Sequence, residues 1–351
     1  MFYEQHIHEQ FEVLLFKISF YLYWLGCYTS FFDYRMMKEL QINKGISIII
    51  KGFSCLLILT HHYCQCMDGK GFDNFFVHLI GMRGGVIGVT FFFFLSAWGL
   101  SESQKKNKYP FITFAKRRLS KVYIPLVLTN LIYYLFLLCL NQISFNLTFF
   151  LLMLFNLKML DGVLWFCNVI IIFYLIFYIA FLFQSKLGKI IFCVVATILY
   201  SVVVTTLYPD SPFYVYSIIG FPFGLLLSLY KESVMNFYYW VLWCLVFIVP
   251  LLLCAVLFPI FSKLFFMNII SFVIISILIC FVFILRRADF SYTIYMILSF
   301  VGIYSYEIYL LHYKVLLFVA ELDMLIWYPL SLLILIIPLS VILHKVSKNL
   351  A

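Results

Sequence analysis

Long uninterrupted runs of apolar residues dominate this sequence, and short polar stretches separate them. Each run extends over about 17 to 23 residues, the length that a helix needs to cross the hydrocarbon core of a bilayer. A transmembrane barrel would instead alternate apolar and polar residues over roughly ten positions. The pattern therefore predicts an all-α integral membrane protein with about ten transmembrane helices in one bundle. The predicted spans are Ile46–His62, Gly84–Leu100, Val122–Leu140, Val163–Phe183, Ile190–Leu207, Tyr214–Leu229, Phe237–Phe258, Leu264–Leu285, Tyr292–Leu311 and Leu325–Leu343.

Two further apolar segments fit this pattern less well. Phe11–Phe32 is apolar enough to span but carries Glu12 and Lys17, so it is either an extra helix or an interfacial one. Phe149–Leu157 is too short to cross and is expected to be re-entrant or to lie flat on the membrane. We therefore expect an N-terminal segment over residues 1–44, followed by one transmembrane domain over residues 45–347.

The composition agrees with a membrane location. Hydrophobic residues make up 65% of the 351 positions and charged residues 11%, whereas a soluble domain is about half apolar and a quarter charged. The ten cysteines lie mostly inside apolar runs without the spacing of metal ligands, so we expect buried thiols and no metal site. Because Glu4 and Glu9 occupy the place of a basic leader region, no removable signal peptide is expected.

The formal net charge of +9 is placed in a way that predicts the orientation of the chain. Basic residues gather in alternate connections between the runs, whereas the intervening connections are lightly charged and more acidic. The positive-inside rule then places the basic loops and the C-terminus in the cytoplasm, with the protein in the plasma (inner) membrane. The same placement argues against nucleic acid as a partner. The basic residues are Arg35, Lys38, Lys44, Lys105, Lys106, Lys108, Lys116, Arg117, Arg118, Lys121, Lys186, Lys189, Lys231, Arg286, Arg287, Lys345 and Lys348, and the acidic ones are Asp68, Asp73, Asp161, Asp210, Glu321 and Asp323.

Ionisable residues inside predicted spans are costly and mark candidate chemistry. Lys51 and His62 lie eleven residues apart in the first span, so they share a helix face about 16 Å apart, whereas His61 is rotated by about 100°. In one interpretation Lys51 extends to the cytoplasmic interface and the histidines mark the other. In the other, His62 is a general base, because neutral imidazole suits proton removal from a hydroxyl.

Five sequence blocks, in order, resemble the acyltransferase-3 family of membrane acyltransferases, of the sugar or polysaccharide O-acetylase type. The first block has a basic residue and a histidine separated by ten positions. Two further blocks come next, and the fourth is a mid-chain Leu-Trp-Phe. The chain departs from the family pattern at Lys51, where arginine is commoner, and at Ala97, where glycine is usual. The blocks are Lys51–His62, Gly88–Leu100, Phe114–Pro125, Leu164–Phe166 and Ser305–His312.

The resemblance implies transfer of an acyl group, most often acetyl, from cytoplasmic acyl-CoA to a hydroxyl of a cell-surface glycan or lipid-linked sugar. It implies His62 and Glu307 as catalytic residues. Contact with the donor is implied for Lys51, Arg117, Arg118 and Lys121, and contact with the acceptor for His61, Ser96, Trp165, Tyr309 and His312.

Simpler roles remain open for several of these side chains. Arg117 and Arg118, placed in a cytoplasmic loop, would then only set the topology. Glu307 would pair with a buried base, although the sequence shows no partner near it, and His312 would lie at the outer interface.

Other classes of protein compete with the enzyme interpretation. A transporter or flippase would show internal repeats with broken helices in both halves, and no such self-similarity is visible. A glycan polymerase is expected to have a large outer loop, whereas the outer loops here are short. A non-catalytic membrane scaffold stays open because of Lys51 and Ala97. Since no serine or cysteine lies in a nucleophile motif, the enzyme interpretation favours direct transfer, with His62 activating the acceptor.

Overall fold

The computed structural model describes residues 44–67, 74–234 and 292–350, almost all of them in one compact unit formed by residues 42–230 and 244–351. Every regular element in these residues is helical, which confirms the predicted fold class. The predicted segments Phe11–Phe32, Phe237–Phe258 and Leu264–Leu285 lie outside the described residues, and the domain boundary predicted after residue 44 stays a prediction.

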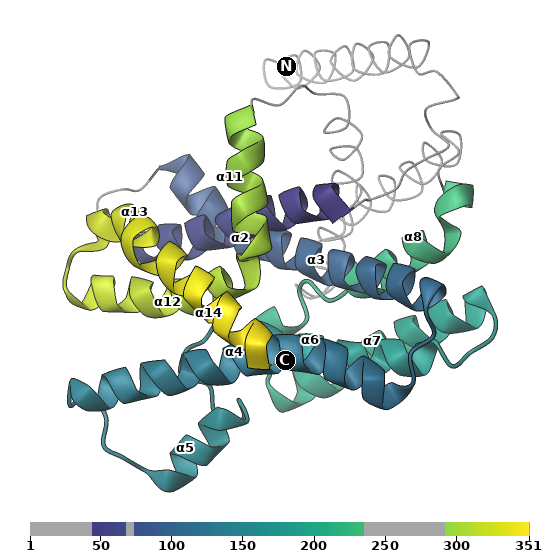
Figure 1. The fold of residues 1–351 in the computed structure, drawn as a ribbon, viewed down its shortest axis with the longest axis horizontal. Coiled ribbons are helices and arrows are strands. Elements are labelled where there is room, and N and C mark those ends of the chain that lie inside the picture. Colours follow the sequence, from purple (N-terminus) through teal and green to yellow (C-terminus); the bar gives the residue numbers. More distant parts are fainter. Residues whose placement is uncertain (1–43, 68–73, 235–291, 351) are drawn as a thin grey trace, which may run out of the picture. The chain divides into compact units, whose positions relative to one another are not determined.

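Long helices with short connections make up the described chain (Figure 1). Helix α2 contacts α3, α11 and α12, so residues from both ends of the described chain meet along it. The elements are α2 (Lys44–Met67), α3 (Phe75–Lys106), α4 (Phe111–Cys139), α5 (Leu147–Leu154), α6 (Trp165–Ala180), α7 (Lys186–Leu207), η2 (Pro212–Tyr214), α8 (Gly220–Val234), α11 (Tyr292–Ile303), α12 (Ser305–Glu321), η3 (Leu325–Trp327), α13 (Tyr328–Ser331), η4 (Leu332–Ile336) and α14 (Ile337–Leu350).

Several of these helices are long and apolar enough to cross a membrane, so the protein is a multi-pass membrane protein. There are five such helices in the described residues, or six when one bent pair is counted as a span. Apolar helices of 10–17 residues stand where two further spans were predicted, at Trp165–Ala180 and Gly220–Tyr230. The total of about ten spans stays a prediction. The five long spans are Lys44–Met67, Val77–Lys106, Phe111–Cys139, Lys186–Leu207 and Leu325–Leu350.

Helix α7 shows most clearly that these surfaces face lipid. Only 11% of its most apolar window is buried inside the protein. Ile191, Ile198, Leu199 and Val202 each expose about half or more of their surface. Such a continuous apolar face is stable only when lipid covers it.

The predicted span Tyr292–Leu311 is not one helix, and that prediction was wrong. The chain bends by 81° between α11 and α12, and Tyr304 at the break has non-helical angles (φ −99°, ψ 11°). The hydroxyl of Ser305 donates to the carbonyl of Gly302 at 3.1 Å, which occupies a carbonyl at the end of α11. The break therefore places the first turn of a new helix in the interior of the protein.

Glycines allow α2 and α11 to cross with their backbones almost in contact. A Cβ atom on Gly52 would lie 2.0 Å from the carbonyl oxygen of Leu298, and one on Gly302 would lie 1.9 Å from that of Ile48. No side chain fits at such distances, so both positions require glycine. Small residues are the usual means of close helix packing in membranes, where apolar side chains gain little by leaving lipid.

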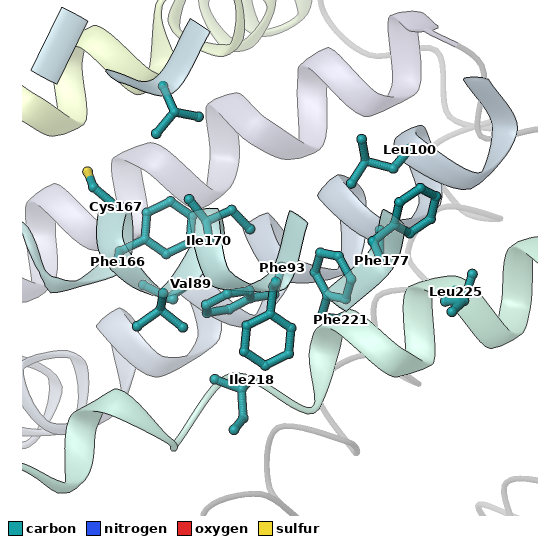
Figure 2. Packing of buried hydrophobic residues seen from close by; sticks show 14 of the residues in the cluster. Val89, Phe93, Leu100, Phe166, Cys167, Ile170, Phe177, Ile218, Phe221 and Leu225 are labelled. Atoms are coloured by element: carbon teal, nitrogen blue, oxygen red, sulfur yellow. The ribbon is translucent and has the colours of Figure 1, made fainter. Parts of the chain in front are cut away.

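Aromatic side chains fill the core between α3, α6 and α8 (Figure 2). The ring of Phe93 on α3 packs edge-on against Phe166 of α6, with centroids 5.1 Å apart. Phe173 of α6 lies 5.1 Å from Phe221 of α8, and Phe93, Phe173 and Phe221 are fully buried. This packing holds α6 in place. With 16 residues, α6 is shorter than the roughly 20 residues that a helix needs to span a bilayer.

Candidate functional site

A cavity of about 950 Å³, called the main cavity below, lies beside α2. Lys44, Lys51 and Ile58 line it at intervals of seven residues, and this spacing keeps them on one face of the helix. At 1.5 Å per residue they extend over about 21 Å along the axis. The cavity thus follows α2 from a charged end to an apolar one.

Helices α4 and α14 complete the charged end of the main cavity. The six cations that line it are Lys44, Lys51, Lys116, Arg117, Lys121 and Lys348. Within the described part of the chain, none of them forms an ion pair with an acidic side chain. Like charges close together raise the local positive potential and attract anions. The charged end therefore suits a ligand with several negative charges.

Arg117, Arg118 and Lys121 were expected in a loop, and that placement was wrong. Helix α4 begins at Phe111, so all three side chains stand on a helix of 29 residues. Arg117 and Lys121 are four residues apart and share one face, which explains why both line the main cavity, whereas Arg118 lines a smaller neighbouring cavity.

Glu307 lines the main cavity from the first turn of α12. Its carboxylate accepts a hydrogen bond from Nδ1 of His344 on α14 at 2.8 Å, and the Glu307 side chain is 7% exposed. The sequence showed no nearby partner because 37 residues separate the two. Glu307 lies in the first turn of α12, where the positive end of the helix dipole stabilises a carboxylate.

The other end of the main cavity is apolar. Ile58, Val89, Phe166 and Ile170 line it, and Figure 2 shows the last three within the aromatic core. Ile58 is four residues, or about 6 Å along α2, from His62. The apolar end of the main cavity therefore lies about one helical turn from His62.

Ser96 and Tyr309 also line the main cavity, whereas Trp165 does not. The Tyr309 hydroxyl donates a hydrogen bond to the carbonyl of Val163, and its ring lies 5.6 Å from that of Phe166. Trp165 packs against Phe213 and Tyr214 on another side of α6.

His62 lies beyond the apolar end and takes part in a cluster of rings. Its ring centroid lies 4.7 Å from that of His61, 5.4 Å from that of His312 and 5.1 Å from that of Tyr313. Nδ1 of His62 is 3.1 Å from Oε1 of Gln65. If Nδ1 donates this bond, Nε2 presents a lone pair, which is the form that a general base needs.

The ring of His61 is directed toward α3, although it stays close to that of His62. Its Nδ1 lies 3.0 Å from the carbonyl oxygen of Ile80 on α3. A Cβ on Gly85 would lie only 2.6 Å from Nε2 of His61, so the imidazole fills the space that this glycine leaves. These contacts give His61 a packing role between α2 and α3.

His312, expected at the outer interface, is fully buried inside the protein. The predicted span ended at Leu311, but α12 continues to Glu321 and carries His312 into the protein. Its Nδ1 donates to the carbonyl of Tyr309 at 2.6 Å, which leaves Nε2 with a lone pair. Among the described residues, Nε2 has no hydrogen-bond partner.

A buried ion pair that the sequence did not predict lies beside this cluster. Nζ of Lys314 donates to Oδ2 of Asp161, and both side chains are almost completely buried. Oδ1 of Asp161 accepts from the amide of Val163 at 3.1 Å. The contacts of Asp161 and Tyr309 therefore tie the segment before α6 to α12. The sequence pattern predicted Asp161 only as an acidic residue of an outer loop.

The structure thus brings nine of the eleven predicted site residues into two neighbouring groups, and Arg118 and Trp165 lie outside both. Lys51, Arg117, Lys121, Ser96, Glu307 and Tyr309 line the main cavity. His61, His62 and His312 form the ring cluster. Within the described residues, no group of three or more His, Cys, Asp or Glu side chains is placed to hold a metal ion.

Comparison with known proteins identifies the family of the chain. The acyltransferase-3 family, described as an acyltransferase domain, matches residues 46–345. The chain therefore belongs to this family of membrane acyltransferases, which confirms the resemblance seen in the sequence. No curated protein and no solved structure gives a significant match. Family membership indicates an acyl donor and an acyltransferase activity.

Proposed function

We propose that the protein is a membrane-bound O-acyltransferase that moves an acetyl group from cytoplasmic acetyl-CoA to a hydroxyl of a cell-surface glycan or lipid-linked sugar. One observation carries this proposal. The main cavity joins six cations, which have no acidic partner among the described residues, to an apolar end that stops about one helical turn from His62. An acyl-CoA has the same order of properties, with phosphates at one end and a thioester at the end of a thin arm.

The donor would lie with its phosphates against the charged end. Arg117 offers a planar guanidinium that suits bidentate phosphate contact, and the lysines contribute mobile point charges. Lys51 stands midway between Lys44 and Ile58 on the wall of the main cavity, where a point charge would meet the last phosphate or the first amide of the arm. The basic connections would face the cytoplasm, in agreement with the positive-inside rule.

His62 would act as the general base. Nε2 takes the proton of the acceptor hydroxyl while the oxygen attacks the thioester carbonyl. The carbon–sulfur bond then breaks, and the leaving thiolate takes the proton back from the imidazolium. No acyl-enzyme is needed, because the acceptor attacks the donor directly.

The charges near His62 support a neutral acceptor. Lys314, beside the ring cluster, is already paired with Asp161, so it leaves no unmatched charge near the reaction. His312 adds a buried lone pair next to His62 and would contact the acceptor, whereas Glu307 would hold His344 at the wall of the main cavity.

The proposal is tested by incubating membranes that contain the protein with radiolabelled acetyl-CoA. Wild-type membranes are expected to incorporate label into alkali-labile esters, and membranes with an equal amount of His62→Asn protein are not. Full incorporation in the variant would refute the role of His62. Absence of label in both, with folded protein in both membranes, would count against acetyl transfer itself.

A further inference from the structure

A second cavity of about 200 Å³, called the side cavity below, lies on the other side of the α4 cations. Arg117 and Lys121 line both cavities, so the two cavities share a wall at these side chains. Arg118 adds a third cation, and no described residue that lines the side cavity is acidic.

The side cavity differs from a simple phosphate site because part of its wall is aromatic. Phe114 is 3% exposed, and Tyr109 is partly buried beside it. The guanidinium of Arg117 lies 4.5 Å from the centroid of the Tyr109 ring. Flat heterocycles stack on aromatic rings and on guanidinium planes, whatever their hydrogen-bonding groups.

Hydrogen bonds to the backbone of Tyr109 fix the position from which its ring extends. Tyr109 lies in the short connection between α3 and α4, at residues 107–110. The side chain of Gln104, 8% exposed, is directed at both backbone groups of Tyr109, with Nε2 3.3 Å from its carbonyl oxygen and Oε1 3.5 Å from its amide nitrogen. Asn107 also closes the end of α3 by donating to Ser103 at 3.1 Å. An aromatic side chain on so constrained a connection is prepared for stacking at low entropic cost.

We propose that the side cavity binds the purine base of the acyl donor, with Tyr109 as the stacking residue. The phosphates then contact Arg117 and Lys121 on the shared wall, and the pantetheine arm extends into the main cavity. The inference rests on the proposed function, because it assigns one part of the same donor. It predicts that the protein recognises the base and not only the negative charge.

Equilibrium binding to the purified full-length protein in lipid nanodiscs tests this assignment. The probes are CoA, adenosine bisphosphate (base and phosphates without the arm) and phosphopantetheine (arm and phosphate without the base). For Tyr109→Ala we expect about tenfold weaker binding of CoA and of adenosine bisphosphate, with phosphopantetheine changed less than about twofold, because stacking of one base is lost.

Two control variants isolate the stacking contact. Tyr109→Phe keeps the ring and is expected to bind all three probes as the wild type does. Phe111→Ala removes a neighbouring aromatic residue that is 47% exposed, packs on Tyr178 and does not line the side cavity, so it should also leave binding unchanged.

The outcomes separate this inference from the proposed function. Unchanged CoA binding by Tyr109→Ala, or an equal loss for CoA and phosphopantetheine, would overturn the base assignment while acyl-CoA remained the donor. A folded wild-type protein that bound neither CoA nor phosphopantetheine would overturn the proposed function, and the base assignment with it.

Discussion

Helix α12 joins two regions that differ in whether their charged side chains are paired. Near its first turn lies the main cavity, where six cations lack acidic partners in the described chain and the carboxylate of Glu307 is taken by His344. Toward its other end, Lys314 is matched by Asp161 inside the protein, and the neighbouring rings of His62 and His312 each offer a nitrogen lone pair.

This difference explains why one helix can serve two substrates. Unmatched positive charge attracts an anionic ligand, and an uncompensated buried charge near the acceptor would be costly. Compensated charge leaves a region where a neutral hydroxyl can be held and deprotonated. On this account the donor belongs to the first region and the acceptor to the second.

The largest expected effect separates catalysis at His62 from donor binding. His62→Asn should lower the rate of acetyl transfer by about 10²- to 10⁴-fold, because general-base catalysis is lost. The affinity for CoA should change less than about twofold, since His62 does not line the main cavity. Rates from labelled transfer and affinities from CoA binding measure the two quantities. A matching loss of CoA affinity would show that the two regions are not separate.

The buried ion pair should matter for stability. Asp161→Ala leaves Lys314 as an unpaired buried cation and is expected to cost about 3–5 kcal/mol, measured by unfolding of the purified protein. Replacing both partners, as in Asp161→Leu with Lys314→Met, should recover most of the loss. Asp210→Ala, at an exposed acid, should change stability by less than about 0.5 kcal/mol. Equal effects of the two aspartate variants would contradict internal charge compensation.

A smaller effect is expected where one cation of the main cavity is removed. Lys348→Ala should weaken CoA binding about three- to tenfold at low salt, and the loss should shrink as ionic strength rises. Lys345, three residues earlier on α14, is exposed and does not line the cavity, so Lys345→Ala is the matched control. If both variants bind CoA equally, the cavity does not determine donor binding.

The smallest effect concerns the departure from the family pattern at position 51. Lys51→Arg keeps the charge on the wall of the main cavity, so transfer should stay within about threefold of the wild type. Lys51→Met removes the charge at similar length and should raise the KM for acetyl-CoA about tenfold. A KM for Lys51→Met equal to that of the wild type would assign Lys51 to the interface alone.

The features that could be predicted from the sequence are those that follow from the length of apolar runs and from residue spacing along a helix. The apolar runs predicted the helices, and the eleven-residue separation placed Lys51 and His62 at different depths of one helix. Lys51 indeed lines a cavity that extends toward the turn of His62. The resemblance to the family was also visible in short blocks, and the family match covers the same part of the chain.

Tertiary pairing could not be predicted from such spacing. Glu307 and His344 come from different helices, and Asp161 lies in the segment before α6 while Lys314 lies on α12, so neither pair has a sequence signal. No proline marks the break at Tyr304, and the break places Glu307, which was expected within a span, in the first turn of a helix. The predicted end of the span at Leu311 likewise gave no sign that α12 continues and that His312 is fully buried.

The central claim is that the donor enters from the cytoplasmic side and the acceptor reacts beyond His62. Proteoliposomes with the protein in one known orientation, an acceptor glycan on the outer side and membrane-impermeant labelled acetyl-CoA supplied to one side at a time, test it directly. The account predicts labelled glycan only when acetyl-CoA is on the side of the basic connections. Label formed equally from either side, or only from the opposite side, would contradict it.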